Sequence, residues 1–174
     1  MSETLPADSR LTEAARSRIA PLLGRIPSGV FILNAGTPGG ELTGMLASWV
    51  QQASFEPPQV TFAVNKTRYL NDWLRIGANV TLNQVIKGDA TLFRHFGKGF
   101  DRGADAFAGV ETTIGLTGLP LLTAALGSLE CRVCGQLEAG DHLIYLADVI
   151  DAQGFRDPAE HEVFVHLRKN GFSY

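Results

Sequence analysis

A pair of cysteines has the spacing of a metal or redox site. Cys131 and Cys134 form a CxxC motif, which is typical of thiol redox centres and zinc ligands. They lie in a run that alternates apolar and polar residues, and on a strand two positions three apart point to opposite faces. Their sulfurs would then not converge on one metal ion or form a relaxed disulfide. We therefore expect no metal site here and expect Cys131 to pack inward.

A segment of small residues before two prolines, residues 44–58, could line a ligand pocket. Ala47 and Ser48 are small enough for the backbone to approach a ligand, and the Ser48 hydroxyl could hydrogen-bond it. The face of Trp49 could stack on a ligand. Ser54 lies where a turn before the prolines could expose amides to an anion. The alternative is an ordinary strand followed by a loop.

A cation and a hydroxyl side chain follow the next apolar run. Asn65, Lys66 and Thr67 come directly after three alternating apolar residues. Thr67 is predicted to cap a short helix, whose free amides and positive end favour a phosphate group. Lys66 would add a full charge. The alternative is that both side chains are solvated.

Alternating apolar and polar residues predict a mainly β chain. The predicted strands span residues 29–35, 42–50, 60–64, 79–85, 129–137, 143–151 and 161–168. The sequences GTPGGE and EAGDH connect two pairs of them as hairpins, and Asp89 is expected to open a short helix before a glycine-rich surface loop at 97–109. Hairpins without long helical crossovers favour an antiparallel β-barrel with short helices over a doubly wound sheet.

Length and composition limit the class of protein. The chain has 174 residues, 45% of them hydrophobic, and a formal charge of −3. This charge gives no basic face for nucleic acid, and no stretch reaches the roughly 18 apolar residues of a membrane helix. The N-terminus has no secretory signal. We expect one cytoplasmic domain over 1–174, with a helix at about 10–23 that Asp8 or Ser9 caps and Gly24 ends.

Residues 44–58, GMLASWVQQASFEPP, resemble the flavin reductase-like family of FMN-binding split barrels, in which Gly-x-x-Ala-Ser/Asn precedes Ser-x-x-Pro-Pro. The likeness continues through SGV at 28–30, VTLN at 80–83, LECRV at 129–133 and GDH at 140–142. The run HFGKGFDRGADAFAGV and the terminal HLRKNGFSY are most similar to the flavin reductase domain of cyanobacterial diflavin flavoproteins. Those proteins also carry a diiron domain, but its His-x-His-x-Asp run does not occur here.

The resemblance implies an antiparallel split barrel of Greek-key type and adds site residues. Asn83 matches a position near the flavin, where its amide would bond the ring; its alternative role is to close a turn. Lys98 and Phe100 match a Lys-Phe pair that meets the phosphate or ribityl tail and shields the ring, although Gly99 separates them here. Their alternative is a mobile loop. His142, in GDH, falls on the substrate side and is the expected catalytic residue toward nicotinamide.

The function implied is an NAD(P)H-dependent flavin reductase that transfers hydride from NADH or NADPH to bound FMN, with FAD as the alternative flavin. The cofactor supplies the chemistry, so no nucleophile or strong base is required. A homodimer is implied as well. The competing hypothesis is an FMN-binding module that relays electrons to an acceptor protein without its own NAD(P)H activity. A barrel that binds haem through an exposed histidine is a third alternative.

Overall fold

The computed structural model describes residues 11–173, which fall into two compact units. The larger unit runs from Ser28 to Val165, and the smaller one combines the N-terminal helix with the last residues of the chain. The expectation of a single domain over 1–174 stays a prediction. No helix among residues 11–173 is long and apolar enough to cross a membrane.

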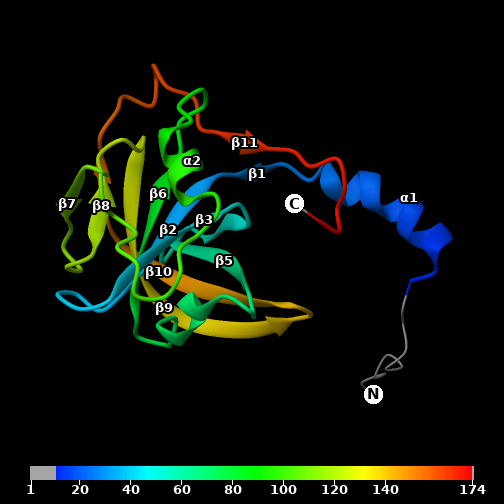
Figure 1. Ribbon diagram of the computed structural model, residues 1–174, viewed down its shortest axis with the longest axis horizontal. Helices are drawn as coiled ribbons and strands as arrows, with labels where there is room; N and C mark the ends of the chain where they lie inside the picture. Colours follow the sequence, from blue (N-terminus) through cyan, green and yellow to red (C-terminus); the bar gives the residue numbers. More distant parts are fainter. Residues whose placement is uncertain (1–10, 174) are drawn as a thin grey trace. The chain divides into compact units, whose positions relative to one another are not determined.

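Strands dominate the larger unit (Figure 1). The helices are α1 (Glu13–Gly24), the 3-10 helix η1 (Tyr69–Asp72) and α2 (Thr91–Phe96), and the strands are β1 (Ser28–Gly29), β2 (Phe31–Gly36), β3 (Leu42–Ala47), β4 (Val50–Ser54), β5 (Gln59–Asn65), β6 (Asn79–Gln84), β7 (Thr112–Ile114), β8 (Pro120–Leu122), β9 (Gly127–Ala139), β10 (His142–Gly154) and β11 (Val165–His166). Seven strands form one antiparallel sheet in the order β3-β2-β6-β9-β10-β5-β4. The predicted antiparallel barrel is confirmed.

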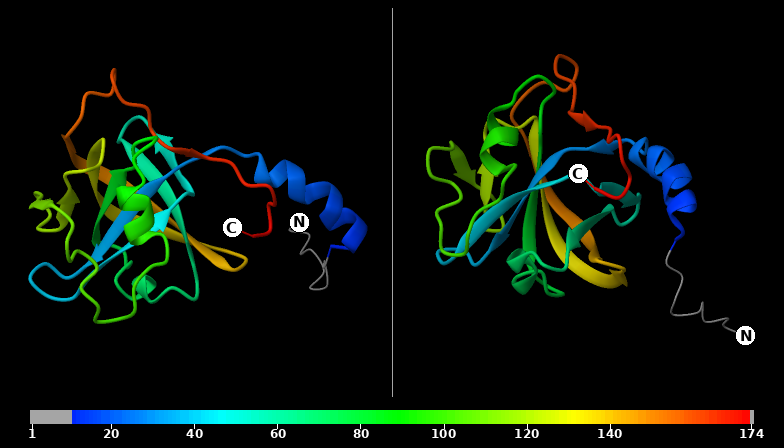
Figure 2. Two further views of the ribbon diagram at one scale, coloured as in Figure 1. Left: turned by 45° about the horizontal axis from the view of Figure 1, so that its top comes forward. Right: turned by 45° about the vertical axis from the view of Figure 1, so that its right-hand side comes forward.

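The sheet curls because consecutive strands lie at its two ends (Figure 2). β3 is one edge and β4 the other, yet only Ser48 and Trp49 separate them in sequence. Two residues span less than about 11 Å, so both edges must come together at this point. The predicted strand at 42–50 is therefore wrong in one respect: it is broken at Ser48, where the barrel splits.

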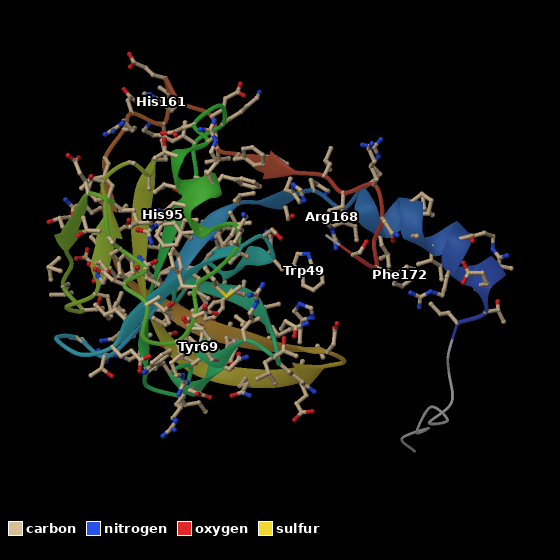
Figure 3. All side chains as sticks on the ribbon, viewed as in Figure 1. Trp49, Tyr69, His95, His161, Arg168 and Phe172 are labelled. Atoms are coloured by element: carbon tan, nitrogen blue, oxygen red, sulfur yellow. The ribbon has the colours of Figure 1, made fainter. Side chains whose placement is uncertain are left out.

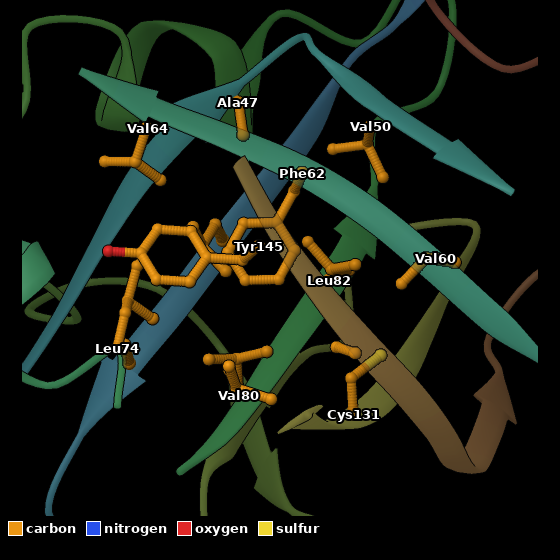
Figure 4. Close-up of a cluster of buried hydrophobic side chains, with 14 of the residues drawn as sticks. Ala47, Val50, Val60, Phe62, Val64, Leu74, Val80, Leu82, Cys131 and Tyr145 are labelled. Carbon is orange, nitrogen blue, oxygen red and sulfur yellow. The ribbon is translucent and has the colours of Figure 1, made fainter. Parts of the chain in front are cut away.

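The barrel interior is filled by the alternating residues of the strands. Val60, Phe62 and Val64 of β5 all point inward, as their spacing predicts. Phe62 stacks on Tyr145, with ring centroids 5.2 Å apart (Figure 4). The Tyr145 hydroxyl donates to Asn71 Oδ1 at 2.9 Å, so the buried phenol is paired. Cys131 also lies in this cluster, which confirms its inward orientation.

The predicted strand at 161–168 is wrong in extent. Its described pairing reduces to β11 and an isolated bridge between Ile86 and Val163. Phe164 takes the inward position, stacked on Phe93 with ring centroids 5.6 Å apart, while Val163 and Val165 are exposed. The Phe164 N–H donates to Val85 O at 2.8 Å, and its carbonyl accepts from Val30 N. These two bonds fix the register that alternation alone could not.

In the smaller unit, the helix predicted at about 10–23 is present as α1, and Gly24 ends it as expected. Its N-cap is Thr12, whose hydroxyl accepts from Ala15 N at 3.2 Å; the predicted caps Asp8 and Ser9 lie outside the described residues. The C-terminal segment packs along this helix: Gly171 N donates to Ala20 O, and the Arg16 guanidinium lies 4.2 Å from the centre of the Phe172 ring (Figure 3).

Glu130 corrects the alternation predicted for β9, which placed it opposite the packing residues. Its side chain is buried, with 2% exposed. The carboxylate accepts bonds from Leu116 N at 2.9 Å, Thr117 N at 2.7 Å and Thr117 Oγ1 at 2.6 Å. It therefore organises the turn between β7 and β8.

We expect Glu130→Gln to lower the free energy of unfolding by about 1–3 kcal/mol, because the new amide group would face donors that need an acceptor. Urea unfolding measures this. Glu160→Gln, at an exposed position, is the matched control and should stay within about 0.5 kcal/mol of the wild type. A Glu130→Gln protein as stable as this control would contradict the role of the carboxylate.

Candidate functional site

The small-residue segment lies where the barrel splits. Ala47 and Ser48 are both buried, whereas Trp49 is 37% exposed. The carbonyl of Trp49 accepts from Ala63 N at 3.0 Å, which ties this end of β4 to β5. The structure thus places Ser48 and Trp49 between the two edges of the sheet, whereas Ala47 ends β3 and its side chain packs in the barrel core (Figure 4).

A narrow slot follows the outer edge of β3, which has no further strand beside it in the sheet. The backbone of such an edge offers hydrogen-bonding groups to a ligand. The slot is lined by Thr43, Gly44 and Met45 of β3, by Arg68, Tyr69 and Leu70, and by Gly99 and Phe100. Its volume is about 20 Å³, close to that of one water. A planar ring can enter only if the Arg68 side and the Gly99 side separate.

Hydrogen bonds and a glycine shape the walls of the slot. The Tyr69 hydroxyl is 2.9 Å from Thr43 Oγ1 and donates to Asp101 O at 3.4 Å. Tyr69, in η1, therefore links β3 to the loop after α2. Gly99 has φ of +71°, and a Cβ there would lie 3.2 Å from the Arg68 guanidinium. Glycine therefore allows the Arg68 side chain to approach the loop.

Sequence reasoning missed Arg68, Tyr69 and Met45 as slot residues. Met45 falls within the strand predicted at 42–50, and Tyr69 within the short helix predicted after Thr67. A usable signal existed for Arg68: it directly follows the predicted phosphate-binding residues Lys66 and Thr67.

Thr67 does not cap a helix, which corrects the prediction. Asn65 Oδ1 accepts from Thr67 N at 3.0 Å and from Thr67 Oγ1 at 2.7 Å, so the hydroxyl closes a local turn. The helix that follows is the 3-10 helix η1, with Arg68 at its N-cap and no side-chain cap. Lys66 Nζ pairs with Glu138 Oε2 at 3.0 Å. Its charge is therefore already shared with a carboxylate.

His142 and Trp49 form a second cluster at this end of the sheet. Their ring centroids are 4.7 Å apart, and His142 pairs with Asn65 across β10 and β5. His142 Nδ1 lies 2.7 Å from Asp141 Oδ1. This contact holds the pKa of Asp141 below its usual range. With Nδ1 donating to Asp141, Nε2 is the ring nitrogen left for a ligand.

Phe100 and Lys98 lie on the loop after α2. The Phe100 ring lines the slot and contacts His95, with centroids 5.3 Å apart, and Phe96, at 5.6 Å. Lys98 is exposed on the same loop. The structure thus brings Phe100 to the slot beside Arg68, whereas Lys98 is not among the residues that line it.

Asn83 is a correction to the predicted set. It is fully buried, and its Nδ2 donates to Ile32 O at 3.0 Å and to Thr81 Oγ1 at 3.3 Å. Its Oδ1 accepts from Leu122 N at 2.9 Å and from Ser128 Oγ at 2.6 Å. All four bonding positions of the amide are used within the protein, so none remains for a flavin.

Ser54 lies apart from the other predicted residues. It pairs with Gln59 at the start of β5, whereas Asn65 ends that strand. Six steps along a strand are roughly 20 Å. Ser54 and Lys66 therefore cannot bind the same phosphate group.

The CxxC cysteines are both free thiols. Burial raises the pKa of Cys131 to about 12, so this thiol stays protonated near neutral pH. Cys134 donates to Leu146 O at 3.5 Å and accepts from Gln59 Nε2 at 3.7 Å. Among residues 11–173, no group of three His, Cys, Asp or Glu side chains could hold a metal ion.

Comparison with known proteins gives one consistent result. The family model described as "Flavin reductase like domain" matches residues 23–171. Diflavin flavoprotein A 1 of Synechocystis sp. is 42% identical over 160 residues, which are 91% of this chain and 27% of that protein. A putative diflavin flavoprotein A 3 of Nostoc sp. is 39% identical over 87% of this chain and 26% of its own length. The chain thus spans about a quarter of these relatives.

Solved structures agree with the family match. NADH:FAD oxidoreductase SgcE6 of Streptomyces globisporus has a TM-score of 0.78 and 29% identity, with 93% of each chain covered. A nitrilotriacetate monooxygenase component B from Mycobacterium thermoresistibile, at 22% identity, shows the same fold, with a TM-score of 0.75 over 91% of this chain and 86% of that one. Since the family model covers most of the sequence and the fold is shared, this chain belongs to the flavin reductase-like family.

Proposed function

We propose that this protein is an NAD(P)H-dependent flavin reductase that passes hydride from the nicotinamide to bound FMN. One observation carries the proposal: at the split of the barrel, Ala47 and Ser48 connect strand β3, which lines the slot, to Trp49, which packs against His142. A family relative of known structure is named as an NADH:FAD oxidoreductase, which supports the same reaction class.

The residues at the split suit the parts of a flavin. Ser48 and the backbone of the open β3 edge offer bonding groups to a ring with polar edges, whereas the Ala47 side chain packs in the barrel core (Figure 4). Phe100 offers an apolar surface. For the phosphate, Arg68 is better suited than Lys66, because Lys66 is paired with Glu138, whereas no ion pair joins Arg68 to a described carboxylate. Lys98, exposed on the loop that carries Phe100, adds a second cation.

The protein's share of the reaction is binding and orientation. A bound flavin supplies the hydride-accepting chemistry. Ser48 and the β3 backbone would stabilise the negative charge that builds on the ring edge. Trp49 and His142 would border the face that nicotinamide approaches, and Asp141 fixes the orientation of the His142 ring.

The length of the relatives favours a second candidate function. The chain matches only 27% of diflavin flavoprotein A 1, so it corresponds to one part of a larger protein there. An electron relay from bound FMN to an acceptor protein fits that relation. Steady NADH oxidation by the purified protein with free FMN supports the reductase, whereas FMN reduction only by a protein donor supports the relay. The homodimer implied by the family is part of the proposal and is measured by light scattering.

We expect Ser48→Trp to abolish FMN retention, because the indole would fill the space between the two sheet edges. Fluorescence titration with FMN measures this, and circular dichroism reports whether the barrel remains folded. Ser54→Trp is the matched control, since Ser54 lies at the far end of β5 from the slot. If Ser48→Trp does not fold, Ser48→Ala replaces it and should weaken FMN binding several-fold. Wild-type FMN affinity in a folded Ser48→Trp protein would show that the site lies elsewhere.

We expect His142→Ala to lower kcat/KM for NADH by about tenfold while the Kd for FMN changes by less than about twofold, because the ring borders the nicotinamide face and not the slot. His161→Ala is the control; His161 lies in the loop after β10, apart from Trp49 and Tyr69 (Figure 3). Equal effects of the two substitutions would remove His142 from the proposed site.

A further inference from the structure

A second and larger cavity lies in the same unit as the slot. It is a groove with a volume of about 550 Å³. Its walls come from the turn between β2 and β3, from η1 and the turn after it, and from the loop after α2, and they include Thr37, Glu41, Asp72, Trp73, Arg75 and Arg102. No residue predicted for the flavin site lies in it. The volume is in the range of small-molecule sites, so the groove can hold a nucleotide.

The groove and the slot share a wall. Tyr69 lines the slot and Trp73 lines the groove, and their rings meet edge to face with centroids 5.8 Å apart. The Arg102 guanidinium lies 5.3 Å from the Tyr69 ring centre and 5.4 Å from that of Trp73. Arg102 is also two residues beyond Phe100, which lines the slot. The two cavities are therefore neighbours, with the contacting side chains of Tyr69, Trp73 and Arg102 at their shared wall.

The charges in the groove suit a nucleotide better than a simple ion. Arg102 pairs with Asp72, while Arg75 has no ion pair with a described carboxylate. Guanidinium groups bind phosphate oxygens with paired hydrogen bonds, so Arg75 can hold a diphosphate. Glu41 supplies a carboxylate that can accept from ribose hydroxyls. The ring of Trp73 and the plane of Arg102 offer stacking surfaces for a base.

We propose that this groove binds the adenosine diphosphate half of a dinucleotide, an inference that rests on the proposed flavin reductase function. FAD and NAD(P)H both carry that half, so the chemistry is shared and the source is a matter for experiment. FMN, which lacks it, would leave the groove empty. The groove then determines which cofactors bind tightly.

The test uses Arg75→Glu in the full chain, with Arg156→Glu as the matched control at an exposed position after β10. Calorimetric titration with ADP probes the groove without any flavin. We expect Arg75→Glu to weaken ADP binding by at least about tenfold, because the carboxylate repels the diphosphate, and the control to leave it within about twofold. No ADP binding by the wild type, or equal ADP binding by both variants, overturns the inference.

Two further measurements identify the source. If the bound adenosine diphosphate half belongs to FAD, Arg75→Glu weakens FAD binding by at least about tenfold, while the affinity for FMN changes by less than about twofold. If it belongs to the nicotinamide cofactor, the KM for NADH rises by a similar factor with FMN as the flavin. If Arg75→Glu changes neither the FAD affinity nor the KM for NADH by more than Arg156→Glu does, the inference is overturned. A wild-type protein that binds ADP but no flavin would instead contradict the proposed function and leave the groove standing.

Discussion

The two-residue connection between β3 and β4 is the constraint on which the rest of the structure depends. These strands are the opposite edges of a seven-stranded sheet, and Ser48 and Trp49 alone join them. The sheet must curl to bring both edges together, and it cannot close fully, because β3 and β4 do not pair with each other. The outer side of β3 is thereby left without a strand partner. At the crossing a small residue, Ser48, takes the buried position, whereas Trp49 is 37% exposed.

The elements around this opening are held by contacts that connect distant parts of the sequence. Tyr69 binds Thr43 of β3 and the carbonyl of Asp101, and Arg102 pairs with Asp72. The turn after β5, the edge strand and the loop after α2 therefore form one polar and aromatic wall. Tyr69 lines the slot and Arg102 lines the groove, and the two side chains are in contact, so a change in either one would alter both cavities. Arg75 lines the groove and has no such link to the slot residues, so a change at Arg75 tests the groove alone.

Alternation in the sequence predicted the barrel well and the polar residues poorly. The alternating apolar residues Val60, Phe62 and Val64 predict β5 because each inward position is apolar. The same alternation predicts the β9–β10 hairpin. The alternation in residues 161–168 is a poor guide because apolar residues occupy the exposed positions. The backbone hydrogen bonds of Phe164 determine which side chains of this segment face inward. Glu130 and Asn83 have partners far along the sequence, such as Thr117, 13 positions from Glu130, and Ser128, 45 positions from Asn83, and no local pattern reveals them. The segment at 44–49 could be identified from its residue types, but its place at a split edge depends on the strand order.

The side chains at the site also restrict its chemistry to what a cofactor brings. The buried Cys131 thiol, with its pKa raised to about 12, is a poor nucleophile, and the His142 ring is held by Asp141 and packs against Trp49. What remains are small residues, backbone groups, aromatic faces and guanidinium cations, which bind and orient but do not react. In such a protein, the preference for one cofactor over another follows from how much of each cofactor contacts the protein. A slot that accepts the flavin and a neighbouring groove that accepts a nucleotide would let the same barrel distinguish FMN from FAD through Arg75, without any change at the reacting ring.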